Sequence, residues 1–182
     1  MKTYEYVGPK DLLDLIKTVG KGEKIASPQD VMNWLDSTAQ KLDSDNQVIA
    51  TYVIDLDNHL LIADRHSEHV VCAGGEDVLS AGEMTFTVSG SEIKVTEVTN
   101  QSTGYCPEPE SWASVEEALV RAGLESPGSF GREFIFRRCM RCGLLNVVKD
   151  DWFVCVSCDE DLSQSRNVNN GGSVAADIDR ND

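Results

Sequence analysis

The sequence predicts an α+β fold: a mostly antiparallel sheet with flanking helices, followed by a small C-terminal zinc ribbon. Apolar residues recur at helical spacing in some segments and alternate with polar residues in others, and these two periods distinguish helices from strands. Four cysteines near the C-terminus form two CxxC pairs, which is the spacing of a zinc ribbon. The chain of 182 residues is long enough for one hydrophobic core and a small metal-stabilised unit.

Helical periodicity marks three segments: residues 9–19, 28–42 and 112–122. The apolar face of the second segment consists of Val31, Trp34, Leu35, Thr38, Ala39 and Leu42. Ser114 and Glu117 match a capping box, in which each side chain accepts a hydrogen bond from a backbone N–H at the start of a helix. We therefore expect three helices, the last of them with a capped N-terminus.

Strand patterns mark five segments of the body: residues 47–55, 59–64, 69–73, 84–89 and 92–98. The first two flank an Asp-Asn turn and the last two flank a Gly-Ser turn, so each of these pairs predicts a hairpin. The sheet is therefore expected to be mostly antiparallel. A further strand, predicted at residues 133–137, leads into the first cysteine pair.

The metal ligands are predicted from spacing alone. Each CxxC pair places two thiolates on one tight turn, so the two pairs together can complete a tetrahedron around one Zn²⁺. The predicted ligands are Cys139, Cys142, Cys155 and Cys158. Because protein sulfur fills every position, no position is open for water or substrate, and the metal is expected to be structural. Iron and a redox-active dithiol are the alternative interpretations.

Composition predicts four units along the chain. These are an α+β domain at 1–123, a linker at 124–131, the zinc ribbon at 132–162 and a disordered tail at 163–182. The tail is assigned to disorder because it is polar and has few apolar residues to anchor it. The chain has neither a secretory leader nor an apolar run of membrane-spanning length, so a cytoplasmic protein without membrane association is expected.

The net charge of −15 is distributed unevenly. Residues 132–158 carry five Lys and Arg against three Asp and Glu, whereas the rest of the chain is acidic. An acidic body repels a phosphate backbone, which argues against nucleic-acid binding by the body. The acidic surface is interpreted either as the solvated surface of a soluble cytosolic protein or as a face that binds a basic protein, such as a nuclease or a basic toxin. Nucleic acid is expected, if at all, at the ribbon face. The side chains that would bind it are Arg132, Arg137, Arg138, Arg141, Lys149, Phe134, Phe136, Trp152 and Phe153. In the alternative interpretation, these aromatic residues pack the ribbon against the body and the arginines neutralise nearby acids.

Polar residues near predicted turns form the second candidate site. His69 and Glu83 are the candidate catalytic residues, and Asn100, Ser102 and Tyr105 are the candidate ligand-binding residues. His69 with Cys72 or Cys106 would supply a base and a nucleophile. In the alternative interpretation, Cys72 is an inert core thiol and Glu83 accepts hydrogen bonds within a turn.

The middle of the chain also resembles a known module. The resemblance rests on His69, the run from Gly75 to Ala81-Gly82-Glu83, and the run from Asn100 to Ser102, Tyr105 and Pro107. They are similar to a module of bacterial toxin-associated proteins and to the C-terminal part of plant IQ-motif calmodulin-binding proteins. The module has a histidine before its tyrosine, and Gly104 stands there in this chain. The resemblance, which covers about forty residues of a chain of 182, implies a fold with a cleft rather than a known reaction. The whole chain is similar to bacterial proteins that pair such a module with a C-terminal zinc ribbon.

Three functions are consistent with these patterns. The first is a cytosolic interaction module, immunity- or regulator-like, that binds a basic protein through its acidic body. The second is an enzyme or nucleotide-ligand domain with a cleft at His69, Glu83, Ser102 and Tyr105. The third is a zinc ribbon that binds single-stranded nucleic acid. The sequence leaves open whether the protein is an enzyme.

Overall fold

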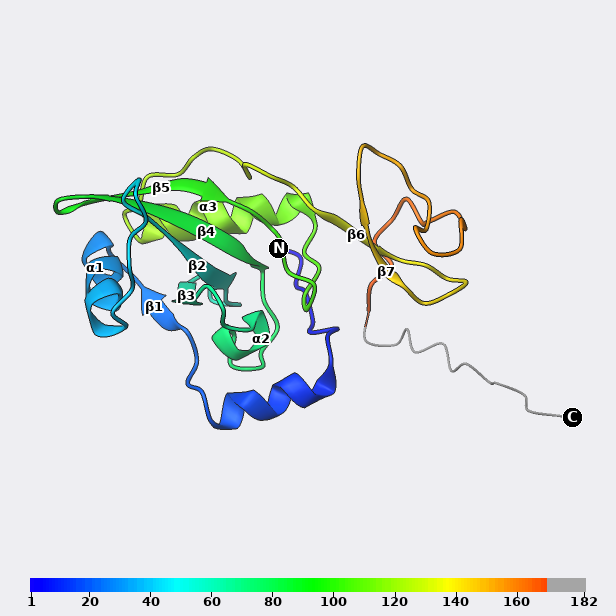
Figure 1. Cartoon of the computed structure of the whole chain (residues 1–182), viewed down its shortest axis with the longest axis horizontal. Helices are drawn as coiled ribbons and strands as arrows, with labels where there is room; N and C mark the ends of the chain where they lie inside the picture. The colour runs from blue at the N-terminus through cyan, green and yellow to red at the C-terminus, as the bar shows by residue number, and fades with distance from the viewer. Residues whose placement is uncertain (170–182) are drawn as a thin grey trace, which may run out of the picture.

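A computed structural model describes residues 1–169, and it confirms an α+β fold with a mostly antiparallel sheet. Five strands form the main sheet in the order β1-β3-β2-β4-β5, and every neighbouring pair is antiparallel. The strands are β1 (Glu23–Ile25), β2 (Gln47–Ile54), β3 (Leu60–Asp64), β4 (Ser80–Ser89) and β5 (Glu92–Val98). Figure 1 shows this sheet in the centre of an elongated molecule.

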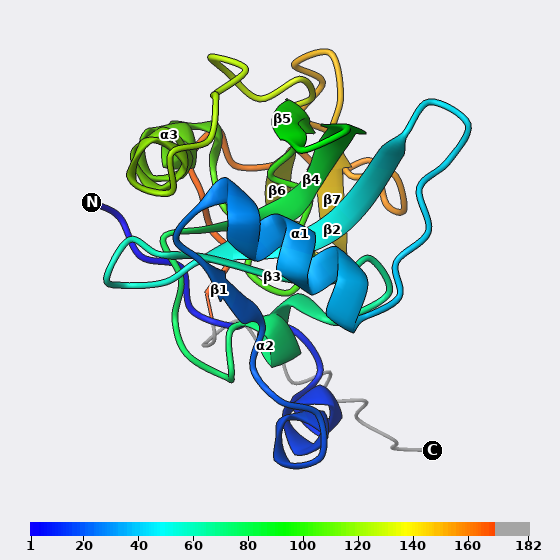
Figure 2. The same ribbon diagram turned by 90° about the vertical axis from the view of Figure 1, so that its left-hand side faces the viewer.

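Two helices pack on one face of the sheet, because alternate residues of the strands place apolar side chains on that face. In β2, Val48, Ala50 and Tyr52 all face the larger core, because successive side chains of a strand point to opposite faces. Helix α1 (Pro28–Ser37) contributes Trp34 to this core, and helix α3 (Trp112–Arg121) contributes Leu119. A short 3₁₀ turn, η2 (Pro109–Ser111), leads into α3. Figure 2 shows α1 and α3 against the strands.

The opposite face carries a smaller core. Val53 and Leu61 point to this side, where they meet α2 (His69–Cys72), the N-terminal segment and the loop at Tyr105. The 3₁₀ helix η1 (Lys10–Lys17) lies at the edge of this core and has no fully buried residue. A bridge between Tyr4 and Val78 holds the N-terminal segment in place.

The cysteine unit, residues 132–162, lies at one end of the molecule, far from α1 (Figure 1). It contains a two-stranded antiparallel sheet of β6 (Ile135–Arg138) and β7 (Leu145–Val148). The four cysteines of the two CxxC pairs lie together in this unit. This arrangement is compatible with the predicted ribbon.

Buried polar contacts connect the body to the cysteine unit. The Asn100 amide nitrogen donates to the carbonyls of Pro107 and Phe134 at 2.8 Å each, and its oxygen accepts the Phe134 N–H at 2.7 Å. Arg137 of β6 forms a bidentate ion pair with Glu108 at 2.8 and 3.1 Å, and only 4% and 9% of these two side chains are exposed. The segment predicted as a linker also packs on the body, because Phe130 is buried and its ring meets Trp112 edge-on.

Residues 69–73 are not a strand, as the sequence pattern suggested, but the short helix α2. The free edge of β3 is already paired with β1, a strand that the pattern did not reveal. Residues 69–73 pair with no strand of the sheet, and the N–H groups of Val71 and Cys72 bond to the Glu68 carbonyl. A short run of apolar residues fits a buried helical turn as well as a strand.

Two helix predictions are also corrected. The second helix ends at Ser37 rather than reaching residue 42, and Ala39 then takes a left-handed φ of 51°. The capping box at α3 does not form, since the Ser114 hydroxyl contacts the Met1 sulfur instead. The helix begins at Trp112, immediately after the 3₁₀ turn.

The first part of the predicted disordered tail is ordered. Val168 is fully buried in a small cluster with Cys106 and Phe136. Asn167 exchanges two hydrogen bonds with the backbone of Arg138, at 2.7 and 2.9 Å. Residues 163–169 therefore pack along the junction between the body and the cysteine unit, and the remainder of the predicted tail lies outside the described residues.

Gly82 permits the segment that follows β5 to approach β4 closely. A Cβ at this position would lie 2.0 Å from the Thr99 carbonyl oxygen, so only glycine allows this approach. The Thr99 carbonyl then accepts a hydrogen bond from the buried Tyr52 hydroxyl at 3.0 Å. The glycine of the Ala-Gly-Glu run thus has a steric role.

We expect Gly82→Ala to lower the free energy of unfolding by about 2–3 kcal/mol, because the backbone of Thr99 must move away from a buried position. Chemical denaturation followed by far-UV circular dichroism measures this change. Gly20→Ala is the matched control, because a Cβ there would have no atom within 4 Å. Equal stability of the two variants would refute the steric role.

Candidate metal centre

Each cysteine pair lies on a turn of the same design. In the first turn, the Gly143 N–H bonds to the Cys139 carbonyl, and in the second, the Asp159 N–H bonds to the Cys155 carbonyl. Gly143 and Asp159 both have a left-handed φ, of 76° and 58°. The equivalent residue after each CxxC pair therefore reverses the chain, so that both sulfurs of a pair face the same point.

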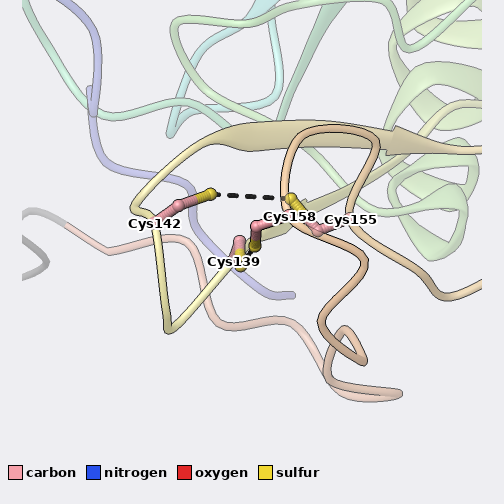
Figure 3. A group of neighbouring side chains, drawn as sticks. All are labelled: Cys139, Cys142, Cys155 and Cys158. Atoms are coloured by element: carbon pink, nitrogen blue, oxygen red, sulfur yellow. Dashed lines mark hydrogen bonds between the residues drawn. The ribbon is translucent and has the colours of Figure 1, made fainter.

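The four sulfurs have the separation that a tetrahedral metal requires. All lie within 4.8 Å of one another, and the Cys139–Cys158 and Cys142–Cys155 sulfur pairs are each 3.6 Å apart (Figure 3). Zn–S bonds of about 2.3 Å at tetrahedral angles place sulfurs about 3.8 Å apart. A disulfide would need about 2.05 Å, and all four cysteines are free. The group can therefore hold one metal ion.

Neighbouring N–H groups support the thiolate form of Cys155. The backbone N–H groups of Ser157 and Cys158 donate to its sulfur and lower its pKa. The Asn146 side-chain nitrogen lies 3.6 Å from the same sulfur, while the Asn146 oxygen accepts the Val156 N–H at 3.0 Å. Such partners orient a ligand and favour its metal-binding form.

The candidate ligand-binding residues serve the fold instead of lining a shared cavity. Asn100, Ser102 and Tyr105 are all fully buried. Asn100 joins the body to the cysteine unit, and the Ser102 hydroxyl accepts the Tyr105 N–H at 3.3 Å. The Tyr105 hydroxyl donates to the Glu76 carbonyl at 2.7 Å, and burial raises its pKa above the ordinary value. Gly104 leaves room for the ring of Tyr6, which a Cβ at this position would approach to 2.8 Å.

The two candidate catalytic residues have different surroundings. The His69 Nε2 lies 3.0 Å from the Gly82 carbonyl oxygen, so the neutral ring can donate to it, and burial lowers the His69 pKa to about 4. Glu83 faces a shallow cavity of about 210 Å³ that Glu97 and Arg132 also line. Its carboxylate is 3.5 Å from Arg65. None of the cavities described in residues 1–169 is lined by both His69 and Glu83.

The two remaining cysteines are unsuited to nucleophilic catalysis. Cys72 and Cys106 are fully buried, and burial raises the pKa of each to about 12. The thiolate is the reactive form of cysteine, and at neutral pH neither thiol ionises appreciably. The interpretation of Cys72 as an inert core thiol fits this environment.

The basic and aromatic residues of the cysteine unit divide into two groups. Phe134 and Phe136 stack on each other at 6.2 Å between ring centroids, next to the junction with the body. Arg137 pairs with Glu108, and Arg141 lies 3.5 Å from Glu160. Trp152, by contrast, is 70% exposed. Arg137 and Arg141 therefore pair with acids of the same chain, whereas the exposed Trp152 lies beside Lys149.

A second group of potential ligands, Asp55, Asp57 and His59, lies in the turn between β2 and β3. One Asp55 oxygen accepts the N–H groups of Asp57 and His59, and the other lies 3.2 Å from the His59 ring. The Asp55 carboxylate therefore serves as the hydrogen-bond acceptor that closes the hairpin turn.

Sequence patterns did not reveal Glu108 or Asn146, although each has a defined role near the candidate sites. Glu108 lies between two prolines and 29 residues from its partner Arg137, so no local spacing connects them. Asn146 lies between the two cysteine pairs in the sequence, and this position was the available signal.

Comparison with protein-family models, curated proteins and solved structures finds no match to this chain. Among residues 1–169, no helix is both long enough and apolar enough to cross a bilayer.

Cys142→Ser should weaken metal binding enough for a chelator to remove the ion, because serine replaces a thiolate that completes the site. Metal content after chelator treatment measures this effect, and amide hydrogen exchange should show loss of protection across residues 132–162. Cys106→Ser is the control, since Cys106 is buried outside the cluster. Full metal retention in Cys142→Ser would contradict the assignment of this ligand.

His69 should make folding stability depend on pH. Its pKa is lowered from 6.5 to about 4 in the folded state, so below pH 6.5 the unfolded chain takes up the proton first. Stability from this residue is present above pH 6.5 and is lost as the pH falls toward 4, by up to about 3 kcal/mol. Urea unfolding across this range should give a flatter profile for His69→Gln, and parallel profiles would contradict the prediction.

Proposed function

We propose that this protein is a structural zinc-ribbon protein of a reducing compartment that binds a basic protein partner through its acidic surface. The observation that carries the proposal is the charge: the chain has 31 Asp and Glu against 16 Lys and Arg. Residues 1–169 form six ion pairs between Lys or Arg and Asp or Glu, of which the Arg137–Glu108 pair alone is buried. The excess of acidic residues over basic ones therefore leaves the protein with a net negative charge to offer a partner.

Zinc is the metal that best fits the cysteine group. Four thiolate ligands at tetrahedral spacing favour zinc, which has no redox chemistry and no preference for another geometry. Cysteine sulfurs fill all four coordination positions, so the ion has no open position for substrate. Its contribution is to hold residues 139–158 in one conformation.

The environment of the candidate catalytic residues argues against the enzyme alternative. A catalytic cleft needs a base and a nucleophile that reach the same space. His69 bonds to a backbone carbonyl, and the nearby candidate thiols are buried and protonated. Glu83 lines a cavity that His69 does not reach, and Arg65 lies 3.5 Å from its carboxylate.

The nucleic-acid alternative is weakened by the placement of the arginines. A single strand needs free cations beside exposed aromatic rings. Arg137 is buried against Glu108, and Arg138 donates to the Gly143 carbonyl. Acidic residues follow the second cysteine pair directly at positions 159–161, so the ribbon face is not a continuous basic surface.

Affinity capture from host lysate at low salt should retain a basic protein, and the identified protein should then be purified and titrated by calorimetry. We expect its dissociation constant to rise at least about tenfold as salt increases, because screening weakens attraction between exposed charges. The matched comparison is the same titration with oligo(dT). Tighter binding of oligo(dT), or no interaction with any basic protein at low salt, would overturn the proposal.

A further inference from the structure

An exposed apolar groove lies on the cysteine unit. It encloses about 500 Å³ and is lined by Val147, Lys149, Asp150, Trp152, Val154 and Val156. We call it the Trp152 groove. Trp152, Val156 and Val147 are 70%, 81% and 37% exposed. A cavity of this volume can hold the side chains of a short peptide.

The alternation of the chain explains how the groove forms. Asp150 and Asp151 both have a left-handed φ, of 51° and 55°, which matches the tight turn that joins two strands in a hairpin. This turn sets Trp152 opposite Lys149, and the Trp152 N–H bonds to the Lys149 carbonyl at 2.9 Å. Successive residues then alternate, so Phe153 and Cys155 face the metal side while Trp152, Val154 and Val156 line the groove.

The fold itself does not require these apolar side chains. The core of the cysteine unit is formed by other residues: Cys139, Val148, Cys155 and Leu162, with Ile135, Phe153 and Cys158 packed against them. Exposure of a tryptophan and neighbouring valines to water is unfavourable, and these side chains do not contribute to this core. Exposed apolar patches with polar edges are typical of interaction sites.

The charges around the groove discriminate among its possible occupants. Lys149 is the one cation that lines it, and Asp150 lines it as well. Asp151 follows in the same turn, and further acids occupy positions 159–161, where the backbone of Asp161 pairs with that of Val154. A nucleic-acid strand would meet these carboxylates. A second copy of the chain would bring the same acidic edge and the same net charge of −15. A basic segment has the complementary charge.

We propose that the Trp152 groove is the docking site for an apolar side chain within a Lys- and Arg-rich segment of a partner protein. This inference rests on the proposed function and names the surface and the chemistry of its partner. The apolar side chain fills the space between Trp152 and Val156, and the flanking cations lie against Asp150 and Asp151. Because Cys155 lies between the groove residues Val154 and Val156, the metal that holds this cysteine also shapes the groove.

The test uses short synthetic peptides as probes with the full-length, metal-loaded protein. One peptide has a phenylalanine between two runs of lysine, and its match has glycine in place of the phenylalanine. We expect the phenylalanine peptide to bind at least about tenfold more tightly, because it adds a buried aromatic contact to the same charge. It should also shift the tryptophan emission of the protein, and Trp152→Ser should remove this shift because Trp34 and Trp112 lie outside the groove.

Variants assign the site. Trp152→Ser and Val156→Ser should each remove the preference for phenylalanine while the metal content stays as in the wild type. Val120→Ser is the matched control, because Val120 of α3 is 68% exposed and lies outside the groove. This control should keep the full preference.

The outcomes separate this inference from the proposed function. If both peptides bind equally and binding falls with salt, the groove is not the docking site, although the acidic surface still binds basic partners. If neither peptide binds, both proposals fail. Oligo(dT) binding that Trp152→Ser removes would overturn the inference in favour of nucleic acid, and self-association that the same variant removes would overturn it in favour of a second copy.

Discussion

The structure depends on the hydrogen bonds of one buried amide. Asn100 lies where the chain leaves the sheet, and it holds the loop that precedes α3 and the strand that enters the cysteine unit at the same time. A buried amide with its polar atoms bonded fixes geometry, because any movement would leave a donor or an acceptor without a partner. Body and cysteine unit therefore meet in a defined orientation, and residues 163–169 pack along the same junction.

The local features of this fold could be predicted from the sequence, and the features that depend on tertiary contacts could not. Spacing alone identified the four cysteines, since two CxxC turns need no distant residue to define them. Alternation identified the β2–β3 and β4–β5 hairpins. The run at residues 69–73 was misassigned because its apolar residues suit a strand or a buried helical turn, and the local pattern does not distinguish the two.

The candidate polar site shows the same limit. Asn100, Ser102 and Tyr105 have the residue types of a binding site, and the sequence does not show whether their polar atoms face a ligand or the backbone. In the folded chain they bond to backbone groups. The Ala-Gly-Glu run is explained in part by the close approach of Thr99 to Gly82. Short motifs of small and polar residues can thus arise from close packing of the backbone as readily as from ligand binding or catalysis.

The buried pair of Arg137 and Glu108 has a consequence for how this chain can be divided. Each residue belongs to a different predicted unit, and only 4% and 9% of their side chains are exposed. A fragment that ends at residue 131 would leave the Glu108 carboxylate without its cation, and a fragment that begins at 132 would release the guanidinium. The residue left in either fragment would lose its partner together with the neighbouring surface that buries both side chains. A cut between the predicted units therefore exposes a surface that the intact chain keeps buried, and a transplanted unit would need a substitute for that surface.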